Sequence, residues 1–280
     1  MRLVRLLFAY TTTTAAAIVH RGACRFFLDT ADPREYATLL PTGLFHGVTT
    51  NPIILQRAGV PCEIGAIRNL AMDAFAQGAS EFMAQAWGGT VERMIETGTA
   101  INAIDPRMVV KVPVTMPGVQ AAKVLSEQNV RVCLTACYAS EQALIAASAG
   151  VEYLAPYLGR MTDSGKNGML EVEKMQAIAR GTGSTTRILV ASIRFVDDMA
   201  ELAAAGLDTF TFSPDIARAL FDASEGLTDA AAAEFEAAAG APPPRGPPGP
   251  PRPGAGRGPP RPGGPPRPGA GPGAGPRRAR

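Results

Sequence analysis

Strand-like and helix-like segments alternate along most of the chain, and this alternation constrains the fold more than any other feature. Eight short segments rich in β-branched or aromatic residues favour strands; they cover residues 25–29, 47–50, 81–87, 108–114, 131–137, 153–157, 187–192 and 209–213. A helix-like segment follows each of them, and Asp32, Pro33 and Thr90 are residue types that favour helix starts. Eight strand–helix units predict a single (β/α)8 barrel, followed by an extra helix over residues 228–239.

An open, doubly wound sheet is the alternative arrangement for alternating strands and helices. That fold commonly carries a glycine-rich phosphate loop, either Gly-x-Gly-x-x-Gly or a Walker loop, after its first strand. Neither motif follows residues 25–29, and the sequence therefore favours the closed barrel.

Both ends of the chain differ in composition from the segment between them. Residues 241–280 consist of 16 Pro, 11 Gly, 8 Arg and 5 Ala, and such a segment lacks the large apolar side chains that a core needs. We therefore predict a leader over 1–24, a barrel domain over 25–240 and a disordered tail over 241–280.

The net charge of +2 minus the eight positive charges of the tail leaves −6 for residues 1–240. Only the tail has arginines that could contact nucleic acid, and it has no aromatic residue to stack on bases. A solvated extension is therefore expected, and nucleic acid is not an expected partner.

The first residues have the composition of an organellar transit peptide. Arg2, Arg5, Arg21 and Arg25 precede the first acidic residue, Asp29, and transit peptides are rich in arginine and poor in acids. The apolar run around Arg5 is too short to cross a bilayer, and no other segment has the length and apolarity to do so. The pattern predicts a plastid or mitochondrial location. If these residues are an unstructured lead into the first strand, a cytoplasmic location is expected.

The chain has few residues of the kinds that bind metals or form disulfides. Its cysteines are scattered without metal-ligand or disulfide spacing, at Cys24, Cys62, Cys133 and Cys137. Such a distribution indicates a reducing environment. Of its two histidines, His20 lies in the predicted leader, so neither a histidine-based triad nor a multi-histidine metal site is expected.

A lysine lies inside the most strand-like segment of the chain. Residues 108–115 have the sequence Met-Val-Val-Lys-Val-Pro-Val-Thr, and alternation places Lys111 on the same face as Val109 and Pro113. Burial disfavours the ammonium form of a lysine, and a neutral amine is the form that condenses with a carbonyl to give a Schiff base. The alternative is structural: an ion pair with a buried carboxylate, or a side chain that reaches the end of the strand.

Polar residues stand at the carboxyl ends of seven of the predicted strands, where barrel enzymes place their chemistry. They are Asp29, Thr50, Asn51, Gln85, Lys111, Thr135, Tyr157, Arg160, Ser192 and Arg194. Each alone has a structural explanation as a cap, a strand residue or a surface charge. Gathered around one buried lysine, their hydroxyl, amide and guanidinium groups suit a phosphorylated polyhydroxy carbonyl compound.

Five short motifs occur in the predicted barrel at its strand ends. They are FLDT at 27–30, GVTTNP at 47–52, VKVPVT at 110–115, APYLGR at 155–160 and ASIR at 191–194. Together they resemble the short transaldolase/fructose-6-phosphate aldolase family, and the resemblance extends over roughly residues 25–239. It implies a (β/α)8 barrel with class I chemistry, in which Lys111 forms a Schiff base with the substrate and neither metal nor cofactor takes part.

The same resemblance assigns roles to the other strand-end residues. Asp29 and Asn51 match the residues that hold the hydroxyl groups of the donor, and Thr50 lies beside Asn51 in the motif. The matching phosphate-binding residues are Arg160, Ser192 and Arg194. The implied partner is a sugar phosphate.

Two positions distinguish the two activities of the family. Transaldolases carry Glu on the third strand and usually Phe on the sixth, where this chain has Gln85 and Tyr157. These two residues and Thr135 resemble the residues with which fructose-6-phosphate aldolases hold a catalytic water. The resemblance therefore favours an aldolase that cleaves and forms the C3–C4 bond of fructose 6-phosphate, giving dihydroxyacetone and glyceraldehyde 3-phosphate. The alternative is a transaldolase of the pentose phosphate pathway, which transfers the dihydroxyacetone unit to another sugar phosphate.

Three features depart from the family pattern. Trp87 closely follows Gln85, Phe235 and alanines replace a tryptophan near the end of the last helix, and the tail has no counterpart. The family implies a homo-oligomer in which that helix contacts a neighbouring subunit, and the alanine-rich residues 228–239 predict a shallow contact. A barrel that serves as a scaffold and binds polyanions through its tail is the non-enzymatic alternative.

Overall fold

Eight parallel strands close into a barrel, and their order around the barrel is their order in the sequence. The structure, a computed structural model, describes residues 24–240. The strands are β1 (Arg25–Asp29), β2 (Phe45–Thr49), β3 (Glu81–Gln85), β4 (Met108–Pro113), β5 (Val132–Cys137), β6 (Tyr153–Pro156), β7 (Arg187–Val190) and β8 (Thr209–Phe212). The pairing of Phe26 in β1 with Phe210 in β8 closes the ring. The predicted (β/α)8 fold is confirmed.

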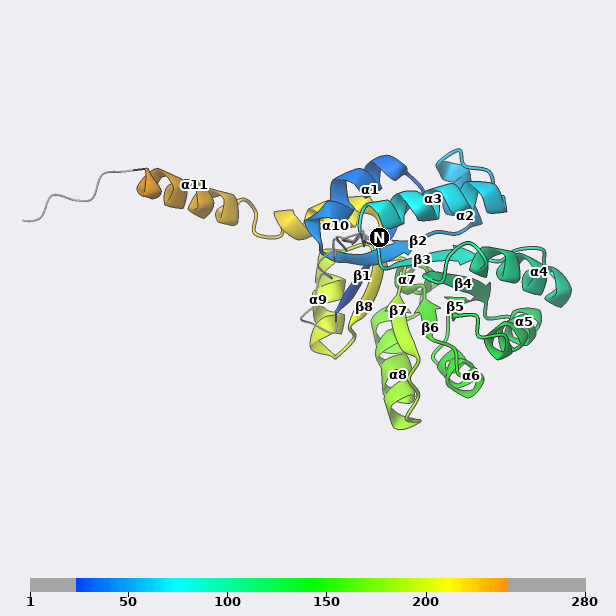
Figure 1. The fold of residues 1–280 in the computed structure, drawn as a ribbon. Coiled ribbons are helices and arrows are strands. Elements are labelled where there is room, and N and C mark those ends of the chain that lie inside the picture. Colours follow the sequence, from blue (N-terminus) through cyan, green and yellow to red (C-terminus); the bar gives the residue numbers. More distant parts are fainter. Residues whose placement is uncertain (1–23, 241–280) are drawn as a thin grey trace, which may run out of the picture. The chain divides into compact units, whose positions relative to one another are not determined.

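Helices connect successive strands and lie around the outside of the barrel (Figure 1). They are α1 (Pro33–Leu39), the 3-10 helix η1 (Leu40–Thr42), α2 (Pro52–Arg57), α3 (Ile64–Ala76), α4 (Val91–Asn102), α5 (Met116–Glu127), α6 (Gln142–Ala149), α7 (Leu158–Asp163), α8 (Gly168–Gly181), α9 (Val196–Ala204) and α10 (Pro214–Asp222). Two predicted helix starts are confirmed. Asp32 accepts a hydrogen bond from the backbone amide of Arg34 at 3.0 Å, and Thr90 accepts one from that of Arg93 at 3.3 Å. Both contacts satisfy amides that the first helical turn leaves without a partner.

Alternation along the strands separates two layers of buried side chains. In β4, Val110 and Val112 belong to the large core between the sheet and the helices. Val109 faces the other way, into a cluster that fills the barrel and consists of Phe27, Met83, Val109, Cys133, Tyr153, Ala155 and Leu189. Lys111 lies two residues beyond Val109 on the same face of β4. The filled interior therefore directs the lysine toward the carboxyl ends of the strands.

A buried carboxylate closes the opposite, amino-terminal end of the barrel. Glu81, the first residue of β3, is 6% exposed and accepts hydrogen bonds from Arg131 at 2.7 Å and from the Tyr153 hydroxyl at 2.9 Å. Its carboxylate also lies 3.1 Å from Nε2 of His46. Burial raises the pKa of Glu81, but the hydrogen bonds from His46 and Arg131 outweigh it and lower the pKa to about 2. A satisfied ion cluster at this end is structural, and it leaves the other end of the barrel for a binding site.

Two short helices lie where the sequence pattern predicted none. The helix α2 begins at Pro52, and Oδ1 of Asn51 caps it by accepting hydrogen bonds from the amides of Ile53 and Ile54 at 3.0 and 3.1 Å. The helix α7 occupies the first part of the loop predicted after β6. Each has six residues, less than two helical turns. Neither is long enough to show the apolar period by which helices are recognised.

The chain divides into two units, and the second begins at Asp229. The helix α11 (Leu227–Ala239) is the one that the sequence predicted over 228–239. Its Leu227 and Phe235 side chains are exposed. The predicted leader, apart from Cys24, and the predicted tail lie outside the described residues. Over the described range, no helix combines the length and apolarity that crossing a membrane requires.

Candidate active site

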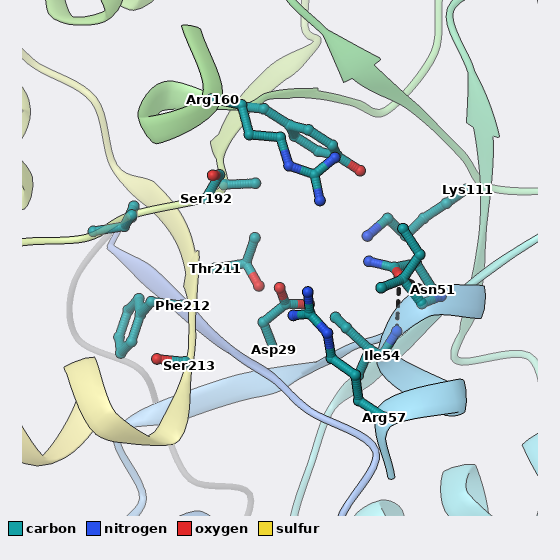
Figure 2. A pocket seen from close by; sticks show the side chains of 14 residues that line it. Asp29, Asn51, Ile54, Arg57, Lys111, Arg160, Ser192, Thr211, Phe212 and Ser213 are labelled. Atoms are coloured by element: carbon teal, nitrogen blue, oxygen red, sulfur yellow. Dashed lines mark hydrogen bonds between the residues drawn. The ribbon is translucent and has the colours of Figure 1, made fainter. Parts of the chain in front are cut away.

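A cavity of about 170 Å³ lies at the carboxyl ends of the strands, and Figure 2 shows the side chains around it. Its walls are formed by residues that end strands or begin the helices after them. They are Asp29, Asn51, Ile53, Ile54, Arg57, Lys111, Tyr157, Arg160, Ala191, Ser192, Ile193, Thr211, Phe212 and Ser213. Six of the residues predicted from the sequence thus line one cavity: Asp29, Asn51, Lys111, Tyr157, Arg160 and Ser192.

Lys111 reaches the cavity from β4. Its side chain is 2% exposed and makes no hydrogen bond or ion pair with the described part of the chain. No close ion pair therefore joins Lys111 to a carboxylate between residues 24 and 240, although its charge acts on the buried carboxyl of Asp29. A buried amine without a hydrogen bond or a close ion pair is available to a ligand in the cavity.

Asp29 ends β1 and lies in a chain of hydroxyl groups. Oγ1 of Thr49 donates to Oδ1 of Asp29 at 2.6 Å, and the hydroxyls of Thr49 and Thr211 lie 2.5 Å apart. Because the single proton of Thr49 is given to the carboxylate, Thr211 donates to Thr49. Burial raises the pKa of Asp29, although Lys111, the Thr49 hydrogen bond and Arg160 each act to lower it. The site thus holds a carboxyl group that is a stronger base than an exposed aspartate.

Tyr157 supplies a phenol on the β6 side of the cavity. Its hydroxyl lies 3.1 Å from Oγ1 of the fully buried Thr135 in β5. The guanidinium of Arg160 stands over the ring at 4.9 Å from its centroid, and the ring of Tyr138 packs edge-on at 5.6 Å. These contacts fix the ring, so the phenol is a positioned proton donor or acceptor.

Gln85 stands beside the lysine but outside the lining of the cavity. It ends β3 and pairs in register with Lys111 of β4. Alternation places its side chain on the interior face with Met83. On the other side of β4, Cys133 of β5 pairs with Lys111, and Thr135 lies two residues further along, opposite Pro113.

Asn51 combines a structural and a binding role. Its Oδ1 accepts the two amides that cap α2, so its Nδ2 group is the part left to face a ligand. Thr50, the preceding residue, is fully buried, and its hydroxyl has no hydrogen-bond partner among residues 24–240. Thr50 does not line the cavity.

The three residues predicted to bind phosphate do not all meet in the cavity. Arg160 lines it and donates to the Tyr138 hydroxyl at 3.3 Å. Ser192 lines it too, with a left-handed backbone (φ 58°) that is uncommon for a residue other than glycine. Arg194 lies elsewhere, in an ion pair with Asp163. The structure brings Arg160 and Ser192 together and turns Arg194 toward α7.

Three polar residues in the cavity wall, Arg57, Thr211 and Ser213, were not among those predicted. Arg57 is the last residue of α2, a helix too short to be recognised from its pattern. Thr211 is buried in β8, and its alternation with Thr209 was a signal that could have placed it on the inner face. Across the residues that the structure describes, no three His, Cys, Asp or Glu side chains gather to hold a metal ion.

Comparison with known proteins gives consistent matches. The sequence model of the family described as "Transaldolase/Fructose-6-phosphate aldolase" matches residues 26–241. A "Probable transaldolase" from Rhodospirillum centenum is 34% identical over 76% of this chain and 90% of its own length. Proteins with the same description from Phenylobacterium zucineum (36% identity over 70% and 88%) and Caulobacter vibrioides (33% over 75% and 94%) match similarly.

Among solved structures, a thiamine phosphate pyrophosphorylase from Pyrococcus furiosus aligns with a TM-score of 0.49. The two sequences are 14% identical, and the alignment covers 68% of this chain and 86% of that chain. The fold assignment rests instead on the strand order of the barrel. With the family match over most of the barrel, the identity to the bacterial relatives and the lysine-centred cavity, the chain belongs to the transaldolase/fructose-6-phosphate aldolase family of enzymes.

Proposed function

We propose that the chain is a class I aldolase that cleaves and forms the C3–C4 bond of fructose 6-phosphate. One observation carries this: the buried amine of Lys111 forms no hydrogen bond or close ion pair in residues 24–240 and lines the same cavity as Asp29 and Tyr157. A nucleophile, a base and a proton donor around one cavity are the parts that aldol chemistry requires.

The first step makes an electron sink. The Lys111 amine adds to the C2 carbonyl of the ketose, and uptake of one proton with loss of water gives a protonated imine. This cation accepts electrons from the C3–C4 bond far more readily than the original ketone. Because the buried amine forms no close ion pair in the described part of the chain, it need not break such a contact before it reacts.

The second step breaks the carbon–carbon bond. Asp29 takes the proton of the C4 hydroxyl, directly or through a water, and the electrons of that O–H bond form the aldehyde carbonyl. The C3–C4 electron pair moves into the imine, leaving an enamine on Lys111 and releasing glyceraldehyde 3-phosphate. Burial raises the pKa of Asp29, which makes the carboxylate a better base for this proton.

The third step returns a proton to C3 of the enamine. Tyr157 and Thr135 lie within hydrogen-bonding distance of each other. Gln85 pairs with Lys111 from β3, and Thr135 lies on β5 opposite Pro113, two residues beyond the lysine. We assign these three residues to a water that carries the proton. Hydrolysis of the resulting imine then releases dihydroxyacetone and restores the free amine.

Binding groups surround the reacting carbons. We assign the donor hydroxyls to Asn51, with Thr50 behind it, and the phosphate to Arg160 and Ser192, which line the same cavity. An arginine fork matches the geometry of phosphate oxygens. Arg194 completes the phosphate site if a ligand draws it away from Asp163.

The second candidate is a transaldolase, the activity in the descriptions of the bacterial relatives. Both reactions share the enamine on Lys111. In the transaldolase, the enamine attacks an acceptor aldose phosphate in place of a proton. Gln85 and Tyr157, where transaldolases carry Glu and usually Phe, favour the aldolase because a phenol can donate a proton and a phenyl ring cannot.

One assay run twice separates the two candidates. Purified protein is given fructose 6-phosphate alone, and then fructose 6-phosphate with erythrose 4-phosphate, and glyceraldehyde 3-phosphate is measured in each. The aldolase releases it in both reactions, together with dihydroxyacetone in the first. Release that depends on erythrose 4-phosphate identifies a transaldolase.

A homo-oligomer is part of the same proposal. In α11, Leu227 and Phe235 are 75% and 71% exposed, as expected of side chains that pack on another subunit. Light scattering at micromolar concentration is expected to give a multiple of the 29.2 kDa chain mass. A single species of monomer mass contradicts the expectation.

A further inference from the structure

Arg57 is a positively charged residue in the cavity wall, and the proposed aldol reaction gives it no role. Ten arginine and lysine side chains between residues 24 and 240 form ion pairs with carboxylates. Within that range, Arg57, Arg68 and Lys111 have neither an ion pair nor a hydrogen bond. Two of the three, Arg57 and Lys111, line the same cavity. Arg57 is an exposed residue without an ion pair, so its guanidinium is available to a negatively charged part of a ligand in this cavity.

The position of Arg57 differs from that of the other cavity arginine. Figure 2 shows Arg57 entering from α2 on one side of the cavity and Arg160 entering from α7 on the other, with the Lys111 amine at a height between their guanidinium groups. A single phosphate held by Arg160 and Ser192 therefore leaves Arg57 unoccupied. A ligand that engages both arginines needs a charged group toward each side of the cavity.

Space for a second charged group lies next to Arg57. A second cavity of about 440 Å³ adjoins the first and shares Asp29, Ile54 and Arg57 with it. Its other acidic side chain, Asp32, is already paired with Arg34 at 2.7 Å. That pair has no net charge. Arg57 forms no ion pair with Asp29, the other carboxyl group in the wall of this second cavity, so its guanidinium remains open to an anionic ligand.

We propose that Arg57 binds a second phosphate, so that the cavity accepts ketose bisphosphates as well as fructose 6-phosphate. One phosphate contacts Arg160 and Ser192, the other contacts Arg57 at the entrance of the second cavity, and the carbonyl lies at Lys111 between them. This specificity rests on the function proposed above, because it names a further substrate class for the same lysine. Arg57 is a specificity-determining residue and takes no part in breaking the bond.

Binding of sugar alcohols tests this without any reaction. Glucitol 6-phosphate and mannitol 1,6-bisphosphate carry one and two phosphates and have no carbonyl, so neither can form a Schiff base. Calorimetry with the full chain is expected to show that the bisphosphate binds about tenfold more tightly, the effect of one charge-assisted contact. The Arg57→Gln variant is expected to lose that advantage and to bind the monophosphate as the wild type does. Arg57→Lys is expected to retain part of it.

Matched variants make the result specific. Arg68→Gln removes the other arginine without a partner in the described chain, from α3 and outside both cavities, and is expected to change neither affinity. Arg160→Gln is expected to weaken both ligands by the same factor. Equal binding of the two ligands to the wild type, or equal weakening of both by Arg57→Gln, overturns the inference. Failure of the aldolase itself is detected separately, as absence of turnover with fructose 6-phosphate.

Discussion

The hydroxyl of Thr49 lies 2.6 Å from the carboxylate of Asp29, and the two residues end neighbouring strands of the barrel. This hydrogen bond opposes the effect of burial, which raises the pKa of Asp29. Thr211 holds Thr49 in turn, at 2.5 Å. The basicity of Asp29 is therefore set by hydroxyl groups as well as by burial.

Replacing Thr49 with valine is expected to change the pH dependence of cleavage. The variant keeps the shape of the side chain and removes the donor that lowers the pKa of Asp29. A base acts in its deprotonated form, so a higher pKa moves the acidic limb of the kcat/KM profile to higher pH. Thr49→Ser, which retains the hydroxyl, serves as the control. An unmoved acidic limb in Thr49→Val argues against Asp29 as the base.

Tyr157→Phe is expected to lower kcat for fructose 6-phosphate cleavage by about 100-fold, the low end of the range for a positioned proton donor. The lysine remains, so imine formation at Lys111 should persist. Tyr138→Phe is the matched control, because Tyr138 packs on Tyr157 and contacts Arg160 through its hydroxyl. It is expected to change KM more than kcat. Steady-state kinetics of both variants decide the matter, and similar kcat values in the two would exclude the special role of Tyr157.

Arg160→Gln and Arg194→Gln are expected to raise KM by different amounts, although both arginines were predicted to bind phosphate. Arg160 faces the cavity, whereas Arg194 is paired with Asp163. Loss of one charged contact to phosphate should raise KM by about tenfold in Arg160→Gln and by less in Arg194→Gln. Unphosphorylated dihydroxyacetone as the donor should show no such difference. A larger effect of Arg194→Gln would mean that substrate moves this arginine into the cavity.

Glu81→Gln is expected to destabilise the barrel by about 3 kcal/mol, because it removes the buried carboxylate that Arg25, His46 and Arg131 share. The pKa of Glu81 is about 2 in the folded chain and below its ordinary value. The stabilisation is therefore complete above the unfolded pKa and is lost as the pH falls toward 2. Denaturant titrations of both proteins should converge as the pH is lowered from neutral. A constant difference in stability across that range would contradict the assignment.

The barrel and its lysine could be predicted from the sequence because each depends on local pattern. Alternation in residues 108–114 places Lys111 beside Val109, and the same rule places Thr211 with Thr209. Side chains fill the interior of the barrel. A lysine on the inner face can therefore meet a ligand only at the carboxyl ends of the strands. The local sequence pattern of one strand was therefore sufficient to predict the central residue of the site, Lys111.

The surroundings of the lysine depend on tertiary contacts that have no local pattern. Arg160 and Arg194 both follow strand ends, yet Asp163 holds only Arg194. The left-handed backbone at Ser192 turns the chain just before Arg194. A serine at this position does not predict such a backbone. Arg57 was missed for a related reason, because α2 is too short for its period to be detected.

Trapping the imine at Lys111 tests the central claim most directly. The protein is incubated with fructose 6-phosphate and sodium borohydride, digested, and examined by mass spectrometry for a reduced adduct. The account predicts an adduct on the peptide that contains Lys111, and none in a Lys111→Arg variant. An adduct on Lys123, Lys166 or Lys174, the other three lysines of the chain, or no adduct at all, would contradict it.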